Sequence, residues 1–433
     1  MLETMNIRKK KLGVIGLGYV GLPLAIEYKK IGFDVKGFDV DQSKIDLLNS
    51  GKSYIKHIES NEVKTLLKDG DFATSDFAEL SNVDVIFVCV PTPIDKYRNP
   101  FMGHIEETSH SISKNLKKGH LVLIESSTYP GTTNELIKPI LEKSGLECHS
   151  EFFLAYSPER EDPGNKNFKI DNITKVVGAD DEKSLKLAID IYSKLTKVHP
   201  MNSTYEAEAV KLTENIFRSV NIALVNELRV IYDNMGIDTW NVIEGASTKP
   251  FGFMPFYPGP GIGGHCIPVD PFYLTYKARQ FSMSTRFIEL AGDINASMPA
   301  YVINKCQELL NKNRKPLKSS KVLIMGVAYK KDVDDMRESP SIEIMNRLIA
   351  KGANVEFYDP LIKKIPKMRE YPHFQNLERV NLQDKSYINY DLVLICTDHS
   401  NYDVAKVISE SKLLVDTRNC LPENAYNERI IKA

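Results

Sequence analysis

Residues 12–21 have the sequence Leu-Gly-Val-Ile-Gly-Leu-Gly-Tyr-Val-Gly, and this stretch decides the fold of the N-terminal part of the chain. Gly16, Gly18 and Gly21 form a Gly-x-Gly-x-x-Gly pattern between an apolar run and an amphipathic segment. The first glycine permits a tight turn, the second lets the backbone approach a pyrophosphate, and the third allows a helix to pack closely on a strand. Free N–H groups at the helix start favour phosphate there. The stretch therefore predicts a strand-turn-helix unit that binds a dinucleotide.

Asp39 ends the next apolar run and is the acidic residue expected in such a site. A carboxylate here accepts hydrogen bonds from the adenine-ribose hydroxyls and repels a 2′-phosphate, so NAD is predicted in preference to NADP. Lys44 lies nearby in the sequence and weakens that preference slightly. A glycine-rich turn that only packs is the alternative.

Short apolar, β-branched runs alternate with amphipathic segments on both sides of a helical middle section. This alternation predicts βαβ units and parallel sheets, and hence an α/β, helical, α/β layout. The expected strands are 12–15, 35–38, 83–90 and 121–124, and then 321–325, 354–358, 391–396 and 412–415.

The middle section contains one long helix, expected from Tyr205 to about Met235, because apolar residues recur there at helical spacing without a proline. Such a helix exceeds what one small domain needs, so we expect it to join two domains and to pack against a second copy of itself. Residues 311–320 are polar and basic and are interpreted as a linker. The predicted domains are 1–204, 205–310 and 317–433.

Composition excludes several classes of protein. The 433 residues are 42% apolar, with 56 basic and 57 acidic side chains, which is ordinary globular composition and gives no support for non-specific nucleic-acid binding. No apolar stretch is long enough for a membrane span, and no secretory signal is recognised. The six cysteines are scattered, which argues against a disulfide framework or a zinc site and favours a cytoplasmic protein.

The most unusual segment is 258–270, with four glycines and three prolines in thirteen residues. It predicts a rigid loop whose backbone presses against a ligand. Cys266 lies in this loop, beside His265 and four residues before Asp270, so its thiol is a candidate nucleophile. A buried cysteine that merely fills space is the equally weighted alternative from this loop alone. The role of His265 is left open between tuning the thiol and packing.

Lys211 and Asn215 are four residues apart on the long helix and therefore share a face. Together they could present an ammonium and an amide to one oxyanion, and an exposed polar stripe is the alternative. Glu159 and Arg160 lie in a turn-rich segment after an apolar run, and Thr128 follows the strand expected at 121–124. These are loop positions of the kind that face a ligand crevice.

The C-terminal α/β module lacks the triple glycine, because its first strand ends in Gly-Val-Ala-Tyr-Lys at 326–330. Its ligand need not be a dinucleotide, and a nucleoside diphosphate is the obvious candidate. Lys330, Arg337 and Arg418 supply positive charge near the expected carboxyl ends of strands, where ligands bind in open parallel sheets. Simple surface solvation is the alternative for each of them.

At this point the chain resembles the UDP-glucose/UDP-N-acetylhexosamine/GDP-mannose dehydrogenase family along essentially its whole length. The shared motifs run in the family's order: Gly-Leu-Gly-Tyr-Val-Gly at 16–21, Val-Pro-Thr-Pro at 90–93, Glu-Ser-Ser-Thr at 125–128, Ser-Pro-Glu-Arg at 157–160, Val-Lys-Leu-x-x-Asn at 210–215, Gly-Gly-His-Cys at 263–266 and Arg-Glu-Ser-Pro at 337–340. The resemblance implies two Rossmann-like, doubly wound parallel-sheet domains joined by a helical dimerisation domain, and hence a homodimer or larger homo-oligomer.

The resemblance also implies a reaction: a CH₂OH at C6 of a UDP-sugar is oxidised to a carboxylate at the expense of two NAD. Cys266 would form a thiohemiacetal and then a thioester. The implied catalytic residues are Cys266, Lys211, Asn215, Asp270, Glu159 and Thr128. The implied NAD contacts are Gly16, Gly18, Tyr19, Val20, Gly21, Asp39, Lys44 and Thr92. The implied substrate contacts are Glu159, Arg160, Lys211, Gly263, Lys330, Arg337 and Arg418.

The segments 157–165 and 251–261 look most like the branch that acts on UDP-N-acetylglucosamine, for surface-polysaccharide precursors. UDP-glucose enzymes usually carry serine where this chain has His265, whereas UDP-N-acetylmannosamine enzymes share the Gly-Gly-His-Cys element. Two rivals remain. A single-step 2- or 3-hydroxyacid dehydrogenase would need neither Cys266 nor a second α/β domain, and an inactive NAD-binding assembly protein would fit loss of Cys266, Lys211 or Asp270.

Overall fold

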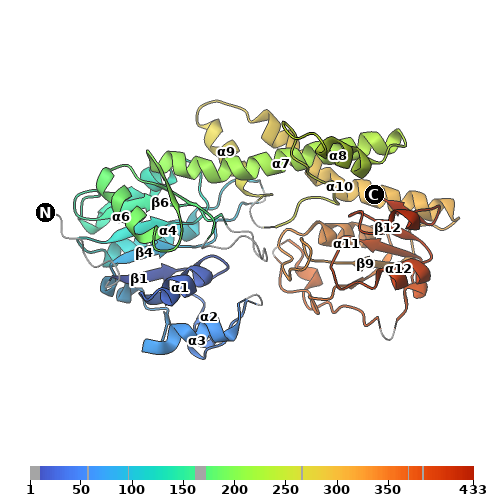
Figure 1. Ribbon diagram of the computed structural model, residues 1–433. Helices are drawn as coiled ribbons and strands as arrows, with labels where there is room; N and C mark the ends of the chain where they lie inside the picture. Colours follow the sequence, from blue (N-terminus) through green and yellow to red (C-terminus); the bar gives the residue numbers. More distant parts are fainter. Residues whose placement is uncertain are drawn as a thin grey trace. The chain divides into compact units, whose positions relative to one another are not determined.

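The computed structural model describes residues 10–55, 58–95, 97–160, 172–264, 267–368, 370–382 and 385–433. The chain divides into two compact units: unit 1 comprises Met1–Glu214 and Phe272–Ser284, and unit 2 comprises Asn215–Pro271 and Thr285–Ala433. Each unit contains one mainly parallel sheet (Figure 1), so the predicted α/β class is confirmed.

The sheet of unit 1 has the strand order β3-β2-β1-β4-β5-β6-β7-β8, which begins with the order of a dinucleotide-binding sheet. All neighbouring strands are parallel except β6 and β7, which are antiparallel. The order reverses between β1 and β4, and ligands of such sheets bind at the carboxyl ends of the strands beside this point. The strands are β1 (Lys11–Ile15), β2 (Asp34–Phe38), β3 (Ala73–Thr74), β4 (Val85–Val88), β5 (Leu121–Ile124), β6 (Phe153–Tyr156), β7 (Lys175–Gly178) and β8 (Val198–Met201).

Helices cover both faces of this sheet, because successive strand residues point to opposite sides and both sides are apolar. On one face the ring of Phe87 lies 5.2 Å from that of Tyr28 in α1 and 5.9 Å from that of Tyr192 in α6. On the other face Ile86 belongs to a core cluster with Ile112 of α4. The helices are α1 (Gly21–Lys30), α2 (Gln42–Asn49), α3 (Ser60–Leu66), α4 (Gly103–Asn115), α5 (Lys138–Leu141), α6 (Glu182–Tyr192) and α9 (Asp270–Arg279), with single turns at η2 (Leu67–Asp69), η3 (Phe77–Asn82), η4 (Thr132–Ile137) and η5 (Glu142–Ser144).

The expected strands of unit 1 are present, but the one expected at 83–90 is shorter, because β4 covers only Val85–Val88. Strands β3, β6, β7 and β8 are not predicted from the sequence. All four have four residues or fewer, and β8 at the sheet edge contains Pro200, which is tolerated in an edge strand but weakens the strand pattern in the sequence.

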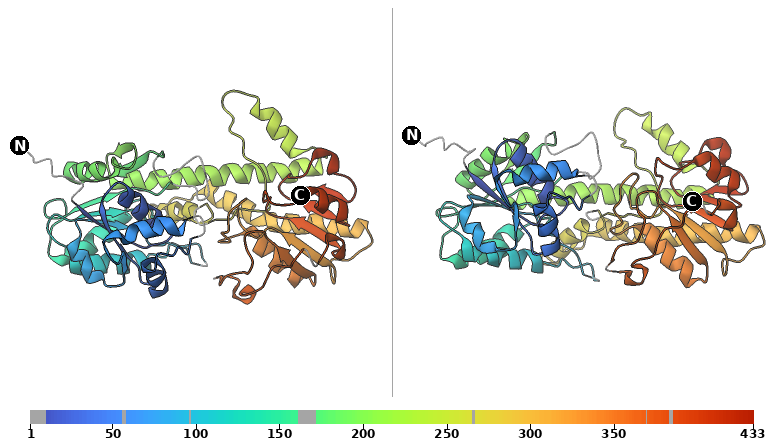
Figure 2. Two further views of the ribbon diagram at one scale, coloured as in Figure 1. Left: turned by 60° about the horizontal axis from the view of Figure 1, so that its bottom comes forward. Right: turned by 90° about the horizontal axis from the view of Figure 1, so that it is seen from below.

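Unit 2 is built on two long helices. The predicted long helix is confirmed as α7 (Thr204–Asn234), 31 residues or about 45 Å, whose residues from Asn215 onward belong to unit 2. It runs beside α10 (Arg286–Lys312; Figure 2), to which it is joined by Asn226 and Asn295 and by Asp233 and Lys305. The linker expected at 311–320 is partly wrong, because α10 continues to Lys312.

The sheet of unit 2 has five parallel strands in the order β10-β9-β11-β12-β13, so its order reverses between β9 and β11. Helices α10 and α11 cover one face and α12 the other. The predicted strands of this part are confirmed with small shifts at their ends. The elements are α8 (Thr239–Ser247), β9 (Lys321–Met325), α11 (Pro340–Ala350), β10 (Asn354–Tyr358), η6 (Pro372–Phe374), η7 (Tyr387–Asn389), β11 (Leu392–Ile395), α12 (Val404–Glu410), β12 (Leu414–Asp416), η8 (Glu423–Ala425) and β13 (Ile430–Lys432).

Candidate active site

The glycine turn of unit 1 has the geometry that dinucleotide binding requires. Gly16 has φ +87°, and its N–H donates to the carbonyl of Phe38 at 2.8 Å. A Cβ on Gly16 would lie 2.6 Å from the carbonyl oxygen of Cys89, and one on Gly21 only 2.1 Å from the carbonyl oxygen of Gly16. A Cβ on Gly18 would meet nothing within 4 Å. Gly16 and Gly21 are therefore needed for the turn itself, while Gly18 leaves open space beside the start of α1 for a pyrophosphate.

Asp39 lies at the carboxyl end of β2 with only 6% of its surface exposed. Its Oδ2 accepts the N–H of Leu17 at 2.9 Å, its Oδ1 accepts the N–H of Asp41 at 3.0 Å, and Lys44 Nζ lies 3.5 Å from Oδ2. Oδ1, with a single donor, keeps capacity for a further one. The residues of the turn thus fit the ribose and pyrophosphate of NAD.

Thr92, also expected to contact the cofactor, is buried in the loop that follows β4, and its carbonyl accepts the hydroxyl of Tyr273 at 2.7 Å. Tyr273 is fully buried and belongs to α9. Tyr19 and Val20 are half-buried in the turn. The residues expected around NAD therefore all belong to unit 1, at the carboxyl ends of β1, β2 and β4.

Unit 1 also brings together Glu159 and Lys211. The Lys211 ammonium donates to the backbone carbonyl of Glu159, and the side chain of Lys211 is buried, so it is not part of an exposed polar stripe. The Glu159 carboxylate accepts the Nζ of Lys175 at 2.9 Å and the N–H of Arg160 at 2.7 Å. The guanidinium of Arg160 pairs with Glu214, at 2.6 Å between Nη2 and Oε1.

Thr128 is fully buried, and its hydroxyl donates a hydrogen bond to the carboxyl of Glu208 in α7 at 3.2 Å. The same carboxylate accepts the N–H groups of Gly131 (2.6 Å) and Thr133 (2.9 Å) and the hydroxyl of Thr133 (2.7 Å). Burial raises the pKa of Glu208 to about 7 against these hydrogen bonds, which lower it. Glu208 thereby anchors the segment after β5 to α7, one helical turn before Lys211.

In unit 2, Asn215 and Asp270 are in direct contact. Asn215 Nδ2 donates to Asp270 Oδ2 at 2.6 Å, and Asp270, the first residue of α9, is 2% exposed. A buried carboxyl that accepts an amide N–H orients the amide. The structure thus joins two of the residues that the sequence analysis selected from segments 55 positions apart.

The glycine-rich loop before Cys266 packs on the second sheet within unit 2. Gly259 N–H donates to the side-chain oxygen of Asn226 at 3.0 Å, and the Gly264 N–H donates to the carbonyl of Arg337 at 3.0 Å. A Cβ on Gly263 would lie 2.6 Å from Cβ of Tyr329, in the loop after β9. Only a residue without a side chain permits this approach. Cys266 and His265 lie outside the described residues.

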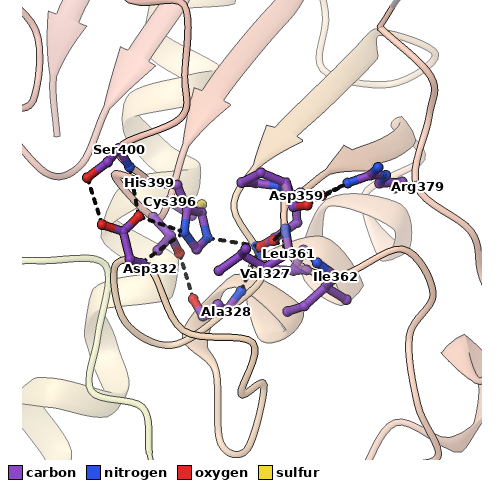
Figure 3. Close-up of polar contacts among 12 residues, drawn as sticks. Val327, Ala328, Asp332, Asp359, Leu361, Ile362, Arg379, Cys396, His399 and Ser400 are labelled. Atoms are coloured by element: carbon purple, nitrogen blue, oxygen red, sulfur yellow. Dashed lines mark hydrogen bonds and ion pairs between the residues drawn. The ribbon is translucent and has the colours of Figure 1, made fainter. Parts of the chain in front are cut away.

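The loop after β9 is held by a buried network that Figure 3 shows. Asp359 at the end of β10 is fully buried and accepts the N–H groups of Val327 and Ala328 and the Nε2 of His399, at 2.9, 3.2 and 3.1 Å. His399 Nδ1 in turn accepts the N–H of Asp332 at 3.0 Å. The hydrogen bond from His399, together with backbone N–H groups, lowers the pKa of Asp359 although burial acts in the opposite direction.

The strand-turn geometry of unit 1 is repeated here with a different outcome. Gly326 has φ +85° and donates to the carbonyl of Tyr358 at 2.8 Å, as Gly16 does to Phe38. However, Asp359, the counterpart of Asp39, also accepts from Leu361 and Ile362 and is saturated by protein donors. It therefore has no capacity for a ribose, which fits a module whose ligand need not be a dinucleotide.

The basic residues expected to bind substrate in unit 2 lie at this carboxyl edge. Arg337 forms a two-pronged pair with Asp335, with contacts of 2.6–3.0 Å. Arg418 Nε donates to the carbonyl of Cys396 at 2.8 Å, and its Nη1 would lie 2.8 Å from a Cβ on Gly259. Lys330 is half-buried in the loop after β9. Arg418 and the glycine-rich loop are therefore neighbours within unit 2.

Five residues that build these sites are not predicted from the sequence: Glu125, Lys175, Glu208, Asp359 and His399. A charged residue next to an apolar run, as at positions 125 and 175, is ambiguous because an exposed strand end has the same pattern. Asp359 directly after a strand could have been found by analogy with Asp39 at the end of the matching strand.

Comparison with known proteins gives matches along the chain. Three models of the UDP-glucose/GDP-mannose dehydrogenase family match it: the NAD binding domain at residues 10–196, the central domain at 205–297 and the UDP binding domain at 323–423. The chain belongs to the UDP-glucose/GDP-mannose dehydrogenase family.

Several relatives match the chain over nearly their full length. It is 36% identical to UDP-N-acetyl-D-glucosamine 6-dehydrogenase of Pseudomonas aeruginosa, covering 97% of this chain and 99% of that protein. It is 33% identical to UDP-N-acetyl-D-mannosamine dehydrogenase of Methanocaldococcus jannaschii, with coverage of 98% and 95%. The solved structure of a UDP-D-ManNAc dehydrogenase from Pyrococcus horikoshii superposes with a TM-score of 0.87 at 30% identity, with 98% of each chain covered.

This member of the family is accordingly an oxidoreductase with NAD as cofactor, as the sequence predicts. Its UDP binding domain supports a UDP-sugar as substrate. Within the described part of the chain, no helix has the length and apolar character needed to cross a membrane.

Proposed function

We propose that the protein oxidises C6 of a UDP-N-acetylhexosamine to the uronic acid in two NAD-dependent steps, with UDP-N-acetylglucosamine as the favoured sugar. The observation that carries this proposal is the 36% identity, over 97% of the chain, to a UDP-N-acetyl-D-glucosamine 6-dehydrogenase. UDP-N-acetylmannosamine is the first alternative, supported by relatives with 31–33% identity, and UDP-glucose is the second. The product would serve surface-polysaccharide synthesis.

NAD, when bound at the glycine turn, supplies the hydride acceptor for both oxidations. After the first oxidation the Cys266 thiolate adds to the C6 aldehyde, forming a C–S bond while the carbonyl electron pair moves to oxygen. An aldehyde has no lone pair ready to expel a hydride until such a nucleophile adds. Loss of the second hydride leaves a thioester, and attack by water breaks the C–S bond and returns the thiol.

The remaining site residues have roles in this scheme that their contacts support. Lys211 and Asn215, four residues apart on α7, would stabilise the oxyanions by charge and hydrogen bonding. Asp270 would orient Asn215, to which it is bonded at 2.6 Å, and take part in proton transfer. Glu159 would accept a proton from the attacking water, and Thr128 would assist by holding the segment after β5.

Substrate binding and domain organisation follow the same proposal. The residues that would contact the UDP-sugar are Glu159, Arg160, Lys211, Gly263, Lys330, Arg337 and Arg418. The NAD-binding domain would be 1–204, the central domain 205–310 and the UDP-sugar-binding domain 317–433. A cytoplasmic location fits the five described cysteines, all of which are free thiols.

The amount of NADH formed per sugar tests the reaction. We expect two NADH per UDP-N-acetylglucosamine consumed. Two NADH from UDP-N-acetylmannosamine or UDP-glucose, with none from UDP-N-acetylglucosamine, would keep the mechanism and overturn the choice of sugar. One NADH per sugar would favour a single-step dehydrogenase, and none from any nucleotide sugar would favour an inactive NAD-binding assembly protein.

We further propose that the protein forms a homodimer through α7. Phe217, Leu224 and Ile231 are spaced seven residues apart on this helix and are each 46–50% exposed, which gives one apolar stripe suited to pairing with a second helix. Leu224→Glu should shift the mass measured by light scattering from dimer to monomer. Arg218→Glu, which adds acidic charge away from the stripe, should leave the dimer intact, and an unchanged mass for Leu224→Glu would refute this interface.

A further inference from the structure

The proposed base Glu159 belongs to a buried ion cluster in unit 1. Lys175 Nζ lies 2.9 Å from Glu159 Oε2 and 2.7 Å from Glu125 Oε2. The side chains of Lys175, Glu125 and Glu159 are 4%, 0% and 11% exposed. Burying three charges is costly unless each is paired, so an arrangement this well enclosed restricts both the position and the charge of its members.

The sheet topology explains why the three residues meet. Glu125 directly follows β5, and β6 lies parallel to β5 with Ile124 beside Tyr156, so Glu125 and the segment after β6 share the carboxyl edge. Strand β7 is antiparallel to β6, with Gly178 beside Tyr156. Lys175, the first residue of β7, is therefore opposite the end of β6, where Glu159 follows. Because β7 runs antiparallel to β6, its first residue, Lys175, lies at the edge of the sheet where β5 and β6 end.

Several other titratable groups face the cluster. Tyr192 of α6 donates to Glu125 Oε1 at 2.8 Å, and Lys211 of α7 reaches the carbonyl of Glu159. Burial raises the pKa of Tyr192, of Tyr28 in α1 and of Cys89 after β4, so these three groups are neutral. The guanidinium of the adjacent Arg160 is already paired with Glu214.

The two carboxylates keep Lys175 charged. Burial alone would lower the pKa of Lys175, but Glu125 and Glu159 raise it above its usual value. Burial raises the pKa of Glu125, and the Lys175 ammonium acts against that rise. Glu159 thus lies beside one ammonium that favours its charged form and near one carboxylate, Glu125, that disfavours it. These two neighbours act in opposite directions on the readiness of Glu159 to take up a proton, which a base must do.

We propose that Lys175 is a positioning residue for the proposed base Glu159, and that Glu125 sets how strongly Lys175 holds it. This inference rests on the proposed function, because it gives Glu159 a proton-accepting role in thioester hydrolysis. Lys175 does not touch the substrate in this account. It aims Oε2 of Glu159 and supplies the positive charge, while Oε1 is fixed by the Arg160 N–H at 2.7 Å.

The pH profile of kcat separates this role from a merely structural one. Lys175→Met leaves two buried carboxylates without their cation, so the acidic limb of kcat should move to higher pH by about 1–3 units, with little change in KM for the sugar. Lys175→Arg should keep the limb near its original position. Glu125→Gln retains an acceptor for Tyr192 and leaves Lys175 to Glu159 alone, so the limb should move to lower pH.

The double variant Lys175→Met/Glu125→Gln removes one charge of each sign and should bring the limb back toward its original pH. Lys277→Met is the matched control, because it removes a buried ammonium from another ion pair of unit 1, with Glu135, and should leave the limb in place. The proposal would be overturned if the acidic limb of kcat lay at the same pH in all variants. It would also be overturned if Lys175→Met and Glu125→Gln moved that limb in the same direction. Glu125→Gln keeps the test decisive if Lys175→Met does not fold.

A titration of the protein without substrate distinguishes this inference from the proposed reaction. In protein labelled with ¹³C at glutamate carboxyls, Glu159→Gln identifies the Glu159 signal. That signal should titrate at higher pH in Lys175→Met and at lower pH in Glu125→Gln, even if no sugar is oxidised. A Glu159 titration that is the same in both variants would refute the role of Lys175 whatever the enzyme's substrate proves to be.

Discussion

Replacing Cys266 with alanine is expected to lower the rate of uronic acid formation by about 10³-fold or more, the scale seen when a covalent nucleophile is removed. Without the thiol no thiohemiacetal forms, so the C6 aldehyde has no tetrahedral carbon from which the second hydride can leave. The variant should form at most one NADH per sugar, and the aldehyde should be trapped by a carbonyl reagent such as hydroxylamine.

Cys148→Ala is the matched control for this experiment, because Cys148 is a buried free thiol of unit 1 outside the proposed site. It should form two NADH per sugar at close to the original rate. NAD and UDP should bind Cys266→Ala as they bind the unaltered protein, since neither is proposed to contact the thiol. Two NADH per sugar from Cys266→Ala would refute the covalent route and leave the cysteine with the packing role that the sequence also allows.

Alanine at Gly21 and alanine at Gly18 should have effects of different kinds, although the two glycines belong to one motif. A Cβ at Gly21 would lie 2.1 Å from the carbonyl oxygen of Gly16, so the turn or α1 must move. We expect Gly21→Ala to lower the free energy of unfolding by about 1–3 kcal/mol or more, the usual cost of overpacking, and to abolish NAD binding.

A Cβ at Gly18 meets nothing in the protein, so Gly18→Ala should unfold at nearly the original temperature. Its methyl group would occupy the space left for the pyrophosphate, and KM for NAD should rise about tenfold or more, equivalent to about 1.4 kcal/mol of lost binding. Denaturant unfolding and NAD titration of both variants check the pair. Equal stability of the two variants would contradict the close contact at Gly21. An unchanged KM for NAD in Gly18→Ala would show that the pyrophosphate does not bind beside Gly18.

Features with a short-range cause could be predicted from the sequence. The turn from Gly16 to Gly21 and the acid at Asp39 follow from steric and hydrogen-bonding needs within one βαβ unit. Helix α7 follows from uninterrupted periodicity, and the central strands from their β-branched composition. Strands β7 and β8 escaped prediction because β7 begins with Lys175 and β8 contains Pro200, so neither forms the continuous apolar run that marks β4 and β5.

The glycine-rich loop shows the limit of this kind of prediction. Four glycines in 258–264 predict close backbone contact, but the sequence does not say with what. In unit 2 the contact is with Tyr329 and Glu338, in the segment between β9 and α11. The order of the strands, and hence the identity of the surface beneath the loop, comes from long-range packing.

By itself, the sequence determined the dinucleotide turn, the choice of NAD and the two α/β modules with their long helix, and it predicted a set of candidate reactive side chains. Only the tertiary structure decided which of those side chains meet. Asn215 touches Asp270, Thr128 is held by Glu208, and Glu159 shares Lys175 with Glu125. The reason is physical: a turn or a helix is set by neighbours within a few residues, whereas a buried charge is stable only beside partners that strand order and direction bring from 16 to 80 positions away.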